Sequence, residues 1–343
     1  MPILSVLIPT YRRPEILPDC LAAVRASVLP DGLSLDILAV DDASGDTTPA
    51  VLDGLAGPDL RVLRHDRNRG PAAARNTGIA AAKGRYTLII NDDTILDRDA
   101  IAQFWAYRQS VPETAVTVIG NIAPWPHEMT AFEFWASSGG SQFTHGHLPP
   151  EKYKDAGETE FVTSNMLVET DLLRQYRFDE SFIYARYEDR ELGYRLARQA
   201  GHRIHYQPTA RSWHCHRLYF REWLGKWDKF SWAAKHFADL YPQDAALRAQ
   251  LSLVRAEQAE HFSLADLKQA VEQLNATVPH YFDADSHPVA QSRAIVDPLF
   301  RQVQEFARLT FLRQHLGFPP RRDGGMTDLD AVPFLSQQLA PGV

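Results

Sequence analysis

The sequence predicts an α/β protein in which a mostly parallel sheet carries helices on both faces and is followed by a C-terminal helical region. Three observations support this. Short apolar runs alternate with helical patterns over residues 1–110. These runs are continuous rather than alternating, which is typical of strands covered on both faces. From residue 220 onward the apolar periodicity is helical.

The first 110 residues contain a βαβ series. Strands are predicted at Ile3–Ile8, Leu35–Val40, Arg61–Arg64 and Tyr86–Ile90. Helices are predicted between them at Glu15–Ser27, Thr47–Leu55 and Pro71–Lys83. Sheets of this kind bind ligands at the carboxyl ends of their strands, so the residues that follow each strand are the candidate site.

The rest of the chain falls into three parts. Region 111–236 is less regular, but Glu188 and Asp189 begin a clear amphipathic helix that Gly201 ends. Region 237–318 is predicted as helical, and a long helix over 288–316 is ended by Gly317. Region 319–343 has little periodicity and is predicted to be an extended tail.

The charge, the cysteine content and the length of the apolar runs exclude several classes of protein. The formal net charge is −7 and the pI is about 6.0, so nothing in the overall charge attracts a nucleic acid, and no nucleic-acid partner is expected. The two cysteines do not have the spacing of a zinc site or a disulfide framework. No apolar run approaches the roughly 20 residues needed to span a bilayer. We therefore expect a cytoplasmic protein, with peripheral membrane attachment left open.

Two polar clusters follow the first two predicted strands. The first consists of Pro9, Thr10, Tyr11, Arg12 and Arg13. Its tyrosine ring can pack on a nucleobase, and either arginine can meet a phosphate. The second cluster is the pair Asp41 and Asp42, whose carboxylates can accept hydrogen bonds from a base or a ribose hydroxyl. Because Asp46 or Thr47 can cap the next helix, we expect both acids to be free for this role.

Two further clusters complete the candidate site. Gly70 and Pro71 open a helix of small residues, and Arg75 on its second turn can reach a ligand. Asn91, Asp92 and Asp93 then follow the strand Tyr86–Ile90. Consecutive polar groups at a buried strand end need compensation, and a divalent cation such as Mg²⁺ or Mn²⁺ supplies it. The competing interpretation, an acidic turn that caps the next helix, is better filled by Asp97 or Asp99.

In this order and spacing, the four clusters resemble the nucleotide-sugar-binding half of family 2 glycosyltransferases, enzymes of the GT-A fold. The resemblance covers residues 3–236. It implies a nucleotide-sugar-binding half over 1–110 and an acceptor half over 111–236. It also implies that Pro9, Tyr11, Asp41 and Arg75 line the nucleobase and ribose pocket. The full predicted donor site comprises Pro9, Thr10, Tyr11, Arg13, Asp41, Asp42, Arg75, Asn91 and Asp92.

The resemblance extends to metal binding. The run NDDT matches the DXD motif of the family and implies that Asp93 holds the divalent cation, Mn²⁺ or Mg²⁺. Asn91 replaces the usual first aspartate, so one charge is lost, although an amide can still serve a ribose hydroxyl or a metal-bound water. In QPTARSWHCHR, His214 matches the histidine that binds the metal or the leaving diphosphate. His216 lies two residues on, and alternate residues of an extended strand share a face.

The acceptor half carries the predicted general base. The run YEDRELGYRL matches the ED motif of the family, and we assign Asp189 as the base, with Glu188 as second choice or acceptor-orienting group. A sugar hydroxyl needs such a carboxylate because it is a weak nucleophile until its proton is removed. The competing interpretation is an acid pair that serves only the helix dipole. The run FVTSNMLVETDLL resembles the acceptor-side loop and implies an acceptor-side role for Asn165.

Taken together, these features predict a metal-dependent, inverting glycosyltransferase, with inversion implied by the resemblance alone. One alternative is a nucleotidyltransferase. That class requires a glycine-rich basic loop after the first strand, whereas this chain has IPTYRRPE there, which lacks glycine. Another is a non-catalytic module that binds nucleotide sugars or glycans, and Asn91 favours it. The expected donor is a nucleotide sugar, and the expected acceptor is a hydroxyl of a glycan, a lipid-linked molecule or a small molecule.

Segment 217–237 interleaves aromatic and basic residues on a predicted amphipathic helix. Three roles are compatible with that pattern: contact with a membrane surface, cover for the core, and pairing of subunits through the C-terminal helices as a homo-oligomer. The pattern favours the second and third roles over the first.

Overall fold

The fold is described from a computed structural model of the chain. The structure describes residues 3–112, 115–126, 131–137, 148–258 and 289–317, together with positions 269 and 273. The chain divides into two compact units. The first takes in the described parts of Met1–Pro126 and Phe143–His216, and the second those of His127–Gln142 and Arg217–Val343.

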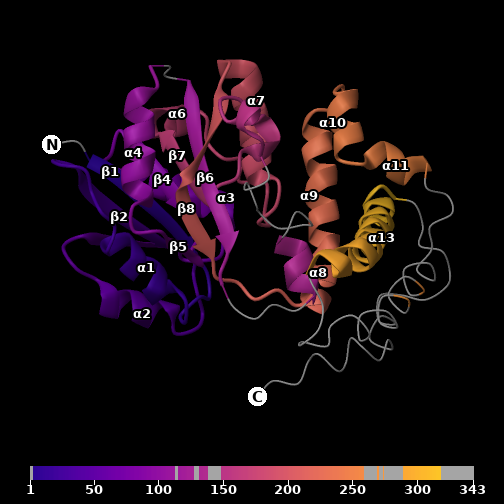
Figure 1. The fold of residues 1–343 in the computed structure, drawn as a ribbon, viewed down its shortest axis with the longest axis horizontal. Coiled ribbons are helices and arrows are strands. Elements are labelled where there is room, and N and C mark those ends of the chain that lie inside the picture. The colour runs from indigo at the N-terminus through magenta and orange to yellow at the C-terminus, as the bar shows by residue number, and fades with distance from the viewer. Residues whose placement is uncertain are drawn as a thin grey trace. The chain divides into compact units, whose positions relative to one another are not determined.

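The first unit is built on an eight-stranded sheet with the order β3-β2-β1-β4-β7-β6-β8-β5 (Figure 1). Its strands are β1 Ile3–Thr10, β2 Ser34–Asp41, β3 Leu60–Arg64, β4 Tyr86–Ile90, β5 Thr94–Leu96, β6 Val116–Pro124, β7 Asn165–Glu169 and β8 Arg203–His214. β1, β2, β3 and β4 pair in parallel, as do β6 and β8. β7 and β5 run antiparallel to their neighbours. The mostly parallel sheet that the sequence predicts is confirmed.

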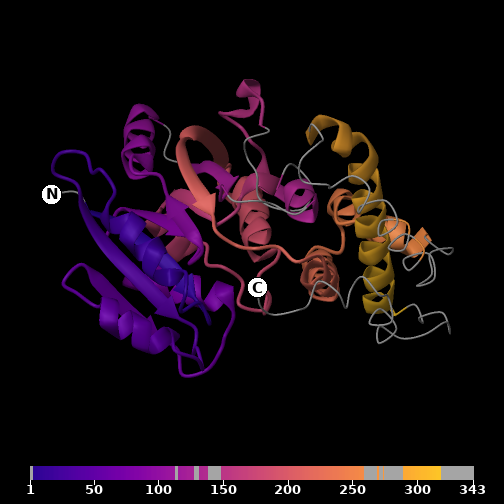
Figure 2. The ribbon, with the colours of Figure 1, turned by 60° about the horizontal axis from the view of Figure 1, so that its bottom comes forward.

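Helices cover both faces of this sheet, as the sequence predicts (Figures 1 and 2). One core cluster joins the strands to α1 Leu17–Arg25, α2 Thr48–Leu55 and α4 Ala100–Ser110. The opposite cluster joins them to α3 Pro71–Ala81, α6 Thr170–Gln175 and α7 Glu188–Ala200. Short 3₁₀ turns lie at Pro150–Lys152 and Glu158–Glu160.

Small residues let α3 approach the sheet closely. A Cβ at Gly78 would lie 2.1 Å from Cδ1 of Leu7 in β1, so only glycine fits there. The helix ends at Ala81, two residues before the predicted end. The helix ends there because the backbone N–H of Lys83 donates to Oγ of Ser5 and to the carboxylate of Asp36 instead of to a carbonyl of the helix.

The second unit is helical in its described parts. Its helices are α5 Ala131–Trp135, α8 Phe220–Gly225, α9 Trp227–Leu240, α10 Ala245–Gln250, α11 Leu253–Gln258 and α13 Val289–His315. The predicted long helix is α13, and Gly317 behind it has the positive φ of a helix-ending glycine. A single helix over 244–258 is not formed, because Ser252 adopts a φ of 66° and separates α10 from α11. The predicted tail 319–343 lies outside the described residues.

The aromatic face of segment 217–237 packs inside the second unit. Trp223, Trp227 and Phe237 are buried. The ring of Trp223 lies 5.2 Å from that of Phe132 and 5.7 Å from that of Trp135, measured between centroids. These contacts are those of a core-covering segment. None of the described helices is long and apolar enough to cross a membrane.

Candidate active site

The ends of β1 and β2 lie side by side at one edge of the sheet. Thr10 and Asp41 are paired in the parallel register, and the N–H of Asp42 donates to the carbonyl of Thr10 at 3.0 Å. Asp41 is buried, and its Oδ1 accepts from the N–H of Ser44. Pro9 is half-buried inside β1, whereas the side chain of Tyr11 is 40% exposed. The tyrosine ring is therefore the part of this edge that is most open to a ligand.

Backbone strain is concentrated beside the predicted site residues. Four non-glycine residues in the described part of the chain have a positive φ, and three of them adjoin predicted site residues: Arg12, Ala43 and Tyr187. A left-handed conformation is unfavourable for such residues and persists where surrounding contacts hold it, often at functional sites. The N–H of Arg12 is held by Oγ of Ser44, which joins the loop after β1 to the loop after β2.

The acids that follow β4 are buried beside an arginine and a histidine. Asp92 and Asp93 are 8% and 5% exposed. Nη2 of Arg13 lies 3.6 Å from Oδ2 of Asp93, and Nε2 of His214 lies 3.6 Å from its Oδ1. β5 pairs with β8 so that Thr94 faces His214, and the N–H of Cys215 donates to the carbonyl of Asp93. The predicted metal residues, which are 121 positions apart, are thus brought together.

A divalent cation fits this arrangement. Oδ1 of Asp93 is buried without a hydrogen bond, which is costly for a carboxylate unless a cation approaches it. One carboxylate with one imidazole leaves room for diphosphate oxygens and waters around a Mg²⁺ or Mn²⁺ ion. Over the described residues, no group of three or more His, Cys, Asp or Glu side chains is arranged to hold a metal by itself.

Burial changes the acidity of Asp92. Desolvation and the neighbouring charge of Asp93 raise the pKa of Asp92 to about 7, although Arg13 acts in the opposite direction. Arg13 also bonds to His216, with Nη1 lying 3.3 Å from Nδ1 of the imidazole. The rings of His214 and His216 lie 5.8 Å apart, with His214 at the end of β8 and His216 just past it.

The side chain of Asn91 is hydrogen-bonded to the residue before β7. Its Nδ2 donates to Oγ of Ser164 at 3.0 Å, and its backbone carbonyl accepts from the thiol of Cys20. The amide group therefore joins the end of β4 to the residue before β7. Sequence reasoning did not single out Ser164.

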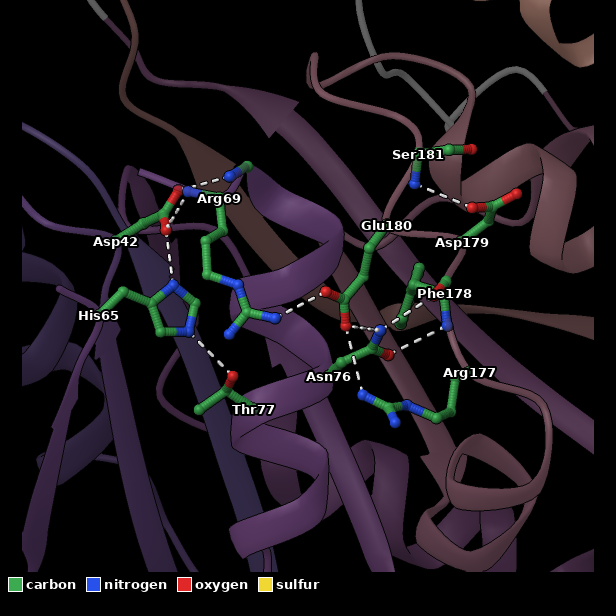
Figure 3. Close-up of polar contacts among 11 residues, drawn as sticks. Asp42, His65, Arg69, Asn76, Thr77, Arg177, Phe178, Asp179, Glu180 and Ser181 are labelled. Atoms are coloured by element: carbon green, nitrogen blue, oxygen red, sulfur yellow. Dashed lines mark hydrogen bonds and ion pairs between the residues drawn. The ribbon is translucent and has the colours of Figure 1, made fainter. Parts of the chain in front are cut away.

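The expectation that Asp42 is free was wrong. Both of its carboxylate oxygens are bound within the protein: Oδ1 accepts from the N–H of Arg69, and Oδ2 accepts from the N–H of Gly70 (Figure 3). Nδ1 of His65 lies 2.6 Å from Oδ1, and its Nε2 lies 2.9 Å from Oγ1 of Thr77. Asp42 thus satisfies the N–H groups ahead of α3, a common use of a carboxylate.

Arg75 and Glu188 form a buried ion pair. Nη1 of Arg75 lies 2.7 Å from Oε1 of Glu188, and the guanidinium also lies 5.6 Å from the centre of the Phe178 ring. Burial, and next the charge of Asp189, raise the pKa of Glu188 to about 7 against the opposing effect of Arg75. Arg75 from the predicted donor side therefore already has an anionic partner at the start of α7.

Asp189 is in a different environment from Glu188. It is only partly buried, and its Oδ1 accepts from the N–H of Arg190 in the first turn of α7. Glu188 is 2% exposed. Of the two acids, Asp189 is the one that solvent can reach.

The acceptor-side expectation for Asn165 does not fit the structure. Its side chain is fully buried in β7, and Nδ2 donates to the carbonyls of Asn121 and Ala210. These contacts lie where the β6–β8 register shifts between Gly120 and Asn121. A Cβ at Gly120 would lie 2.3 Å from this amide nitrogen. Asn165 therefore satisfies backbone groups freed by the bulge, a contact across strands that periodicity does not reveal.

Comparison with known proteins shows which family the chain resembles. The family model described as Glycosyl transferase family 2 matches residues 5–137, a range that includes the ends of β1, β2 and β4. The resemblance to family 2 that the sequence predicts is confirmed over these residues.

Parts of the chain are similar to a protein named as a glycosyltransferase and to a protein named for succinoglycan biosynthesis. The chain is 29% identical over 183 residues to glycosyltransferase GlyG of Streptococcus pneumoniae, which covers 52% of this chain and 58% of GlyG. It is 40% identical over 74 residues to succinoglycan biosynthesis protein ExoO of Rhizobium meliloti, which covers 21% of each. The chain thus spans less than two thirds of the length of either relative.

Solved structures confirm the GT-A fold that the sequence predicts. The mannosyltransferase PcManGT from Pyrobaculum calidifontis, in complex with GDP-Man and Mn²⁺, superposes with a TM-score of 0.57 at 19% identity, covering 91% of this chain and 86% of that one. Residues 1–349 of S. aureus TarS in complex with UDP-GlcNAc give 0.51 at 15% identity, covering 94% and 93%. At these identities the likeness establishes the fold alone.

Sequence reasoning missed a set of contacts that join α3 and the loop ahead of it to the segment before α7. They involve Asn76, Glu180 and Arg69 (Figure 3). The signals were present as an asparagine next to Arg75 and an acid in RFDESF. Pairing positions more than 100 residues apart requires the fold itself.

Proposed function

We propose that the chain is a metal-dependent, inverting glycosyltransferase that moves a sugar from a nucleoside-diphosphate donor to a hydroxyl acceptor. The observation that carries this is the buried Oδ1 of Asp93, which has no hydrogen bond and lies 3.6 Å from Nε2 of His214. A buried carboxylate oxygen without a hydrogen bond is stabilised by a bound cation. A cation at the end of a strand and next to Arg13 can bind the negatively charged oxygens of a diphosphate.

The donor is held by the ends of β1 and β2. The exposed ring of Tyr11 stacks on the nucleobase, Asp41 accepts a hydrogen bond from the base or ribose, and Arg13 turns toward the phosphates. Asp93 and His214 would hold a divalent cation, which when bound would neutralise charge on the diphosphate. The complexes of PcManGT with GDP-Man and Mn²⁺ and of TarS with UDP-GlcNAc support a nucleotide-sugar donor.

Asp189 acts as the general base. Its partly exposed carboxylate takes the proton of the acceptor hydroxyl while that oxygen bonds to the anomeric carbon and the bond from this carbon to the diphosphate oxygen breaks. The nucleoside diphosphate leaves with the bonding electrons. A single displacement of this kind inverts the anomeric centre. Glu188, buried against Arg75, keeps its neighbour in place rather than meeting the acceptor.

The acceptor is a hydroxyl of a glycan or glycoconjugate, including a lipid-linked one. A relative that is 30% identical over 124 residues, covering 35% of this chain and 38% of its own length, is named GalNAc(5)-diNAcBac-PP-undecaprenol beta-1,3-glucosyltransferase of Campylobacter jejuni. We place the protein in the cytoplasm. The C-terminal helices serve contact between subunits or with a membrane surface.

Thermal stabilisation tests donor binding directly. A ligand that binds only the folded state raises Tm by mass action. Nucleoside diphosphates and their sugars would each be added with and without Mn²⁺, and Asp93→Asn would be run beside Asp99→Asn, an exposed acid at the start of α4, as the matched control. The proposal expects a Mn²⁺-dependent rise in the wild type and in Asp99→Asn. The absence of any rise with every nucleotide would contradict it.

Turnover then separates an enzyme from a binding module. Donors that raise Tm would be incubated with the protein and candidate acceptors, and release of nucleoside diphosphate would be measured. The proposal expects release that depends on an added acceptor. Donor binding without release in any combination would favour the non-catalytic module that Asn91 suggests.

A further inference from the structure

One asparagine fixes the segment that leads into α7. Asn76, on the second turn of α3, is 3% exposed. Its Nδ2 donates to the carbonyl of Phe178 at 2.9 Å, and its Oδ1 accepts from the N–H of the same residue at 3.0 Å. A side chain that satisfies both backbone groups of one residue holds that stretch of chain much as a neighbouring strand would (Figure 3).

Glu180 extends this attachment into a network. Its Oε1 accepts from Nδ2 of Asn76 at 3.0 Å and from Arg177 at 3.2 Å, and its Oε2 accepts from Nη2 of Arg69 at 2.7 Å. These four side chains and the backbone of Phe178 are called the Glu180 network. The hydrogen bond from Asn76, and next that from Arg69, lower the pKa of Glu180, so the carboxylate is ionised at neutral pH.

Arg69 belongs to a loop that is itself fixed. The N–H groups of Arg69 and Gly70 are held by Asp42 at the end of β2. A Cβ at Gly70 would lie 3.2 Å from the carbonyl oxygen of Ile183, so the loop passes closely against the segment before α7. The Glu180 network therefore connects the donor-side loop at residues 65–70 with the start of segment 177–187 (Figure 3).

The other end of segment 177–187 carries the acids. Tyr187 adopts a φ of 69° immediately before Glu188 and Asp189, and Glu188 is held to α3 by Arg75. Adjacent residues of α3, Arg75 and Asn76, thus hold the two ends of this segment. Between them Ile183 is 53% exposed. The neighbouring Phe182 is fully buried, so the segment packs against the unit in its middle, and the attachments at its two ends fix where Asp189 lies.

We propose that Glu180 is a positioning residue: through Asn76 and Arg69 it fixes segment 177–187 and thereby the placement of Asp189. The proposal rests on the function proposed above. Glu180 acts through the segment, not on substrate. Its loss should therefore lower the rate of sugar transfer without weakening the donor, because donor contacts come from the ends of β1 and β2. A misplacement of about 1 Å in a reacting group can slow a reaction by about 100-fold.

The variant Glu180→Gln tests this, because it keeps the size of the side chain and removes its charge. The matched control is Asp171→Asn on α6, an exposed acid that pairs with Arg174. Hydrogen exchange is the readout that needs no substrate. Peptides that span 177–190 should exchange faster in Glu180→Gln than in the wild type or the control, while β1 to β4 stay unchanged. Unchanged exchange over 177–190 would overturn the proposal.

Kinetics supply the second readout. In Glu180→Gln, kcat should fall by about 10- to 100-fold with donor Kd unchanged, and Arg69→Met should act in the same direction without adding fully to it. A parallel loss of donor affinity, or a kcat equal to that of Asp171→Asn, would overturn the proposal. If Glu180→Gln does not fold, Glu180→Asp takes its place with the same criteria. A wild type that binds no nucleotide sugar would refute the proposed function, whereas normal wild-type turnover with a fully active variant refutes only the role of Glu180.

Discussion

Arg75 and Glu188 meet inside the first unit, where Nη1 of the arginine lies 2.7 Å from Oε1 of the glutamate and both side chains are almost completely buried. The pair joins α3, which carries the predicted donor-side arginine, to the first residue of α7. The arginine Nε and the glutamate Oε2 make no hydrogen bond. Glu188 is buried in this contact, whereas the adjacent Asp189 is accessible.

Breaking this pair should destabilise the protein in a pH-dependent way. Arg75→Met leaves Glu188 buried without its partner, and loss of one member of a buried ion pair typically costs about 3–5 kcal/mol. The pKa of Glu188 is raised from its ordinary 4.5 to about 7 by burial, and removal of Arg75 raises it further. At low pH, Glu188 in the variant can therefore take up a proton and lose its buried negative charge.

The sign of the pH effect follows from proton binding. Between pH 4.5 and about 7 the folded state holds the Glu188 proton more tightly than the unfolded chain does, so this group contributes stability at low pH that is lost as pH rises. Urea unfolding should give a loss of about 3–5 kcal/mol for Arg75→Met at pH 8 and on the order of 1–2 kcal/mol at pH 5. Equal losses at both pH values would contradict a buried, titrating partner.

Asn165→Ala should lower stability and leave ligand binding intact. The substitution removes the donor shared by the carbonyls of Asn121 and Ala210, although the carbonyl of Asn121 keeps the hydroxyl of Ser212 as a donor. An unsatisfied buried group costs about 1–3 kcal/mol, so chemical unfolding should show a loss of about 1–3 kcal/mol. Donor and acceptor affinities, measured well below Tm, should match those of the wild type. A selective loss of acceptor affinity in a stable variant would restore the acceptor-side interpretation.

Asp93→Asn should remove the increase in donor affinity that Mn²⁺ produces. The change removes the charge that the cation requires, and even indirect disturbances of a metal site typically lower metal affinity by 10- to 100-fold. Calorimetry should show nucleoside-diphosphate affinity falling by at least about 10-fold in the presence of Mn²⁺ and changing little without it. Asp99→Asn should behave as the wild type. An equal response to Mn²⁺ in both variants would remove the metal assignment.

The sheet was predictable because its signals are local. Continuous apolar runs placed β1, β2 and β4, and helix-ending glycines placed the ends of α7 and α13. The antiparallel strand β7 was not predicted, since its pairing with β4 joins residues about 80 positions apart.

Side-chain roles were harder to predict for the same reason. Asp42 and Asn165 have the composition of ligand-binding residues, but contacts from Gly70 and Ala210, distant in sequence, engage them in the structure. Asp93 and His214 were predicted together because the spacing of family motifs records a contact that periodicity cannot reveal.

The central claim is that Asp189 removes the acceptor proton while Glu188 supports it. The most direct measurement compares turnover of the donor in Asp189→Asn and Glu188→Gln, with donor affinity determined on the same preparations. The amide of Asp189→Asn keeps the shape of the side chain but cannot take up the proton, so transfer should slow by about 10²–10⁴-fold with donor Kd unchanged, and Glu188→Gln should lose less. Normal turnover in Asp189→Asn, with or without loss of activity in Glu188→Gln, would contradict the account.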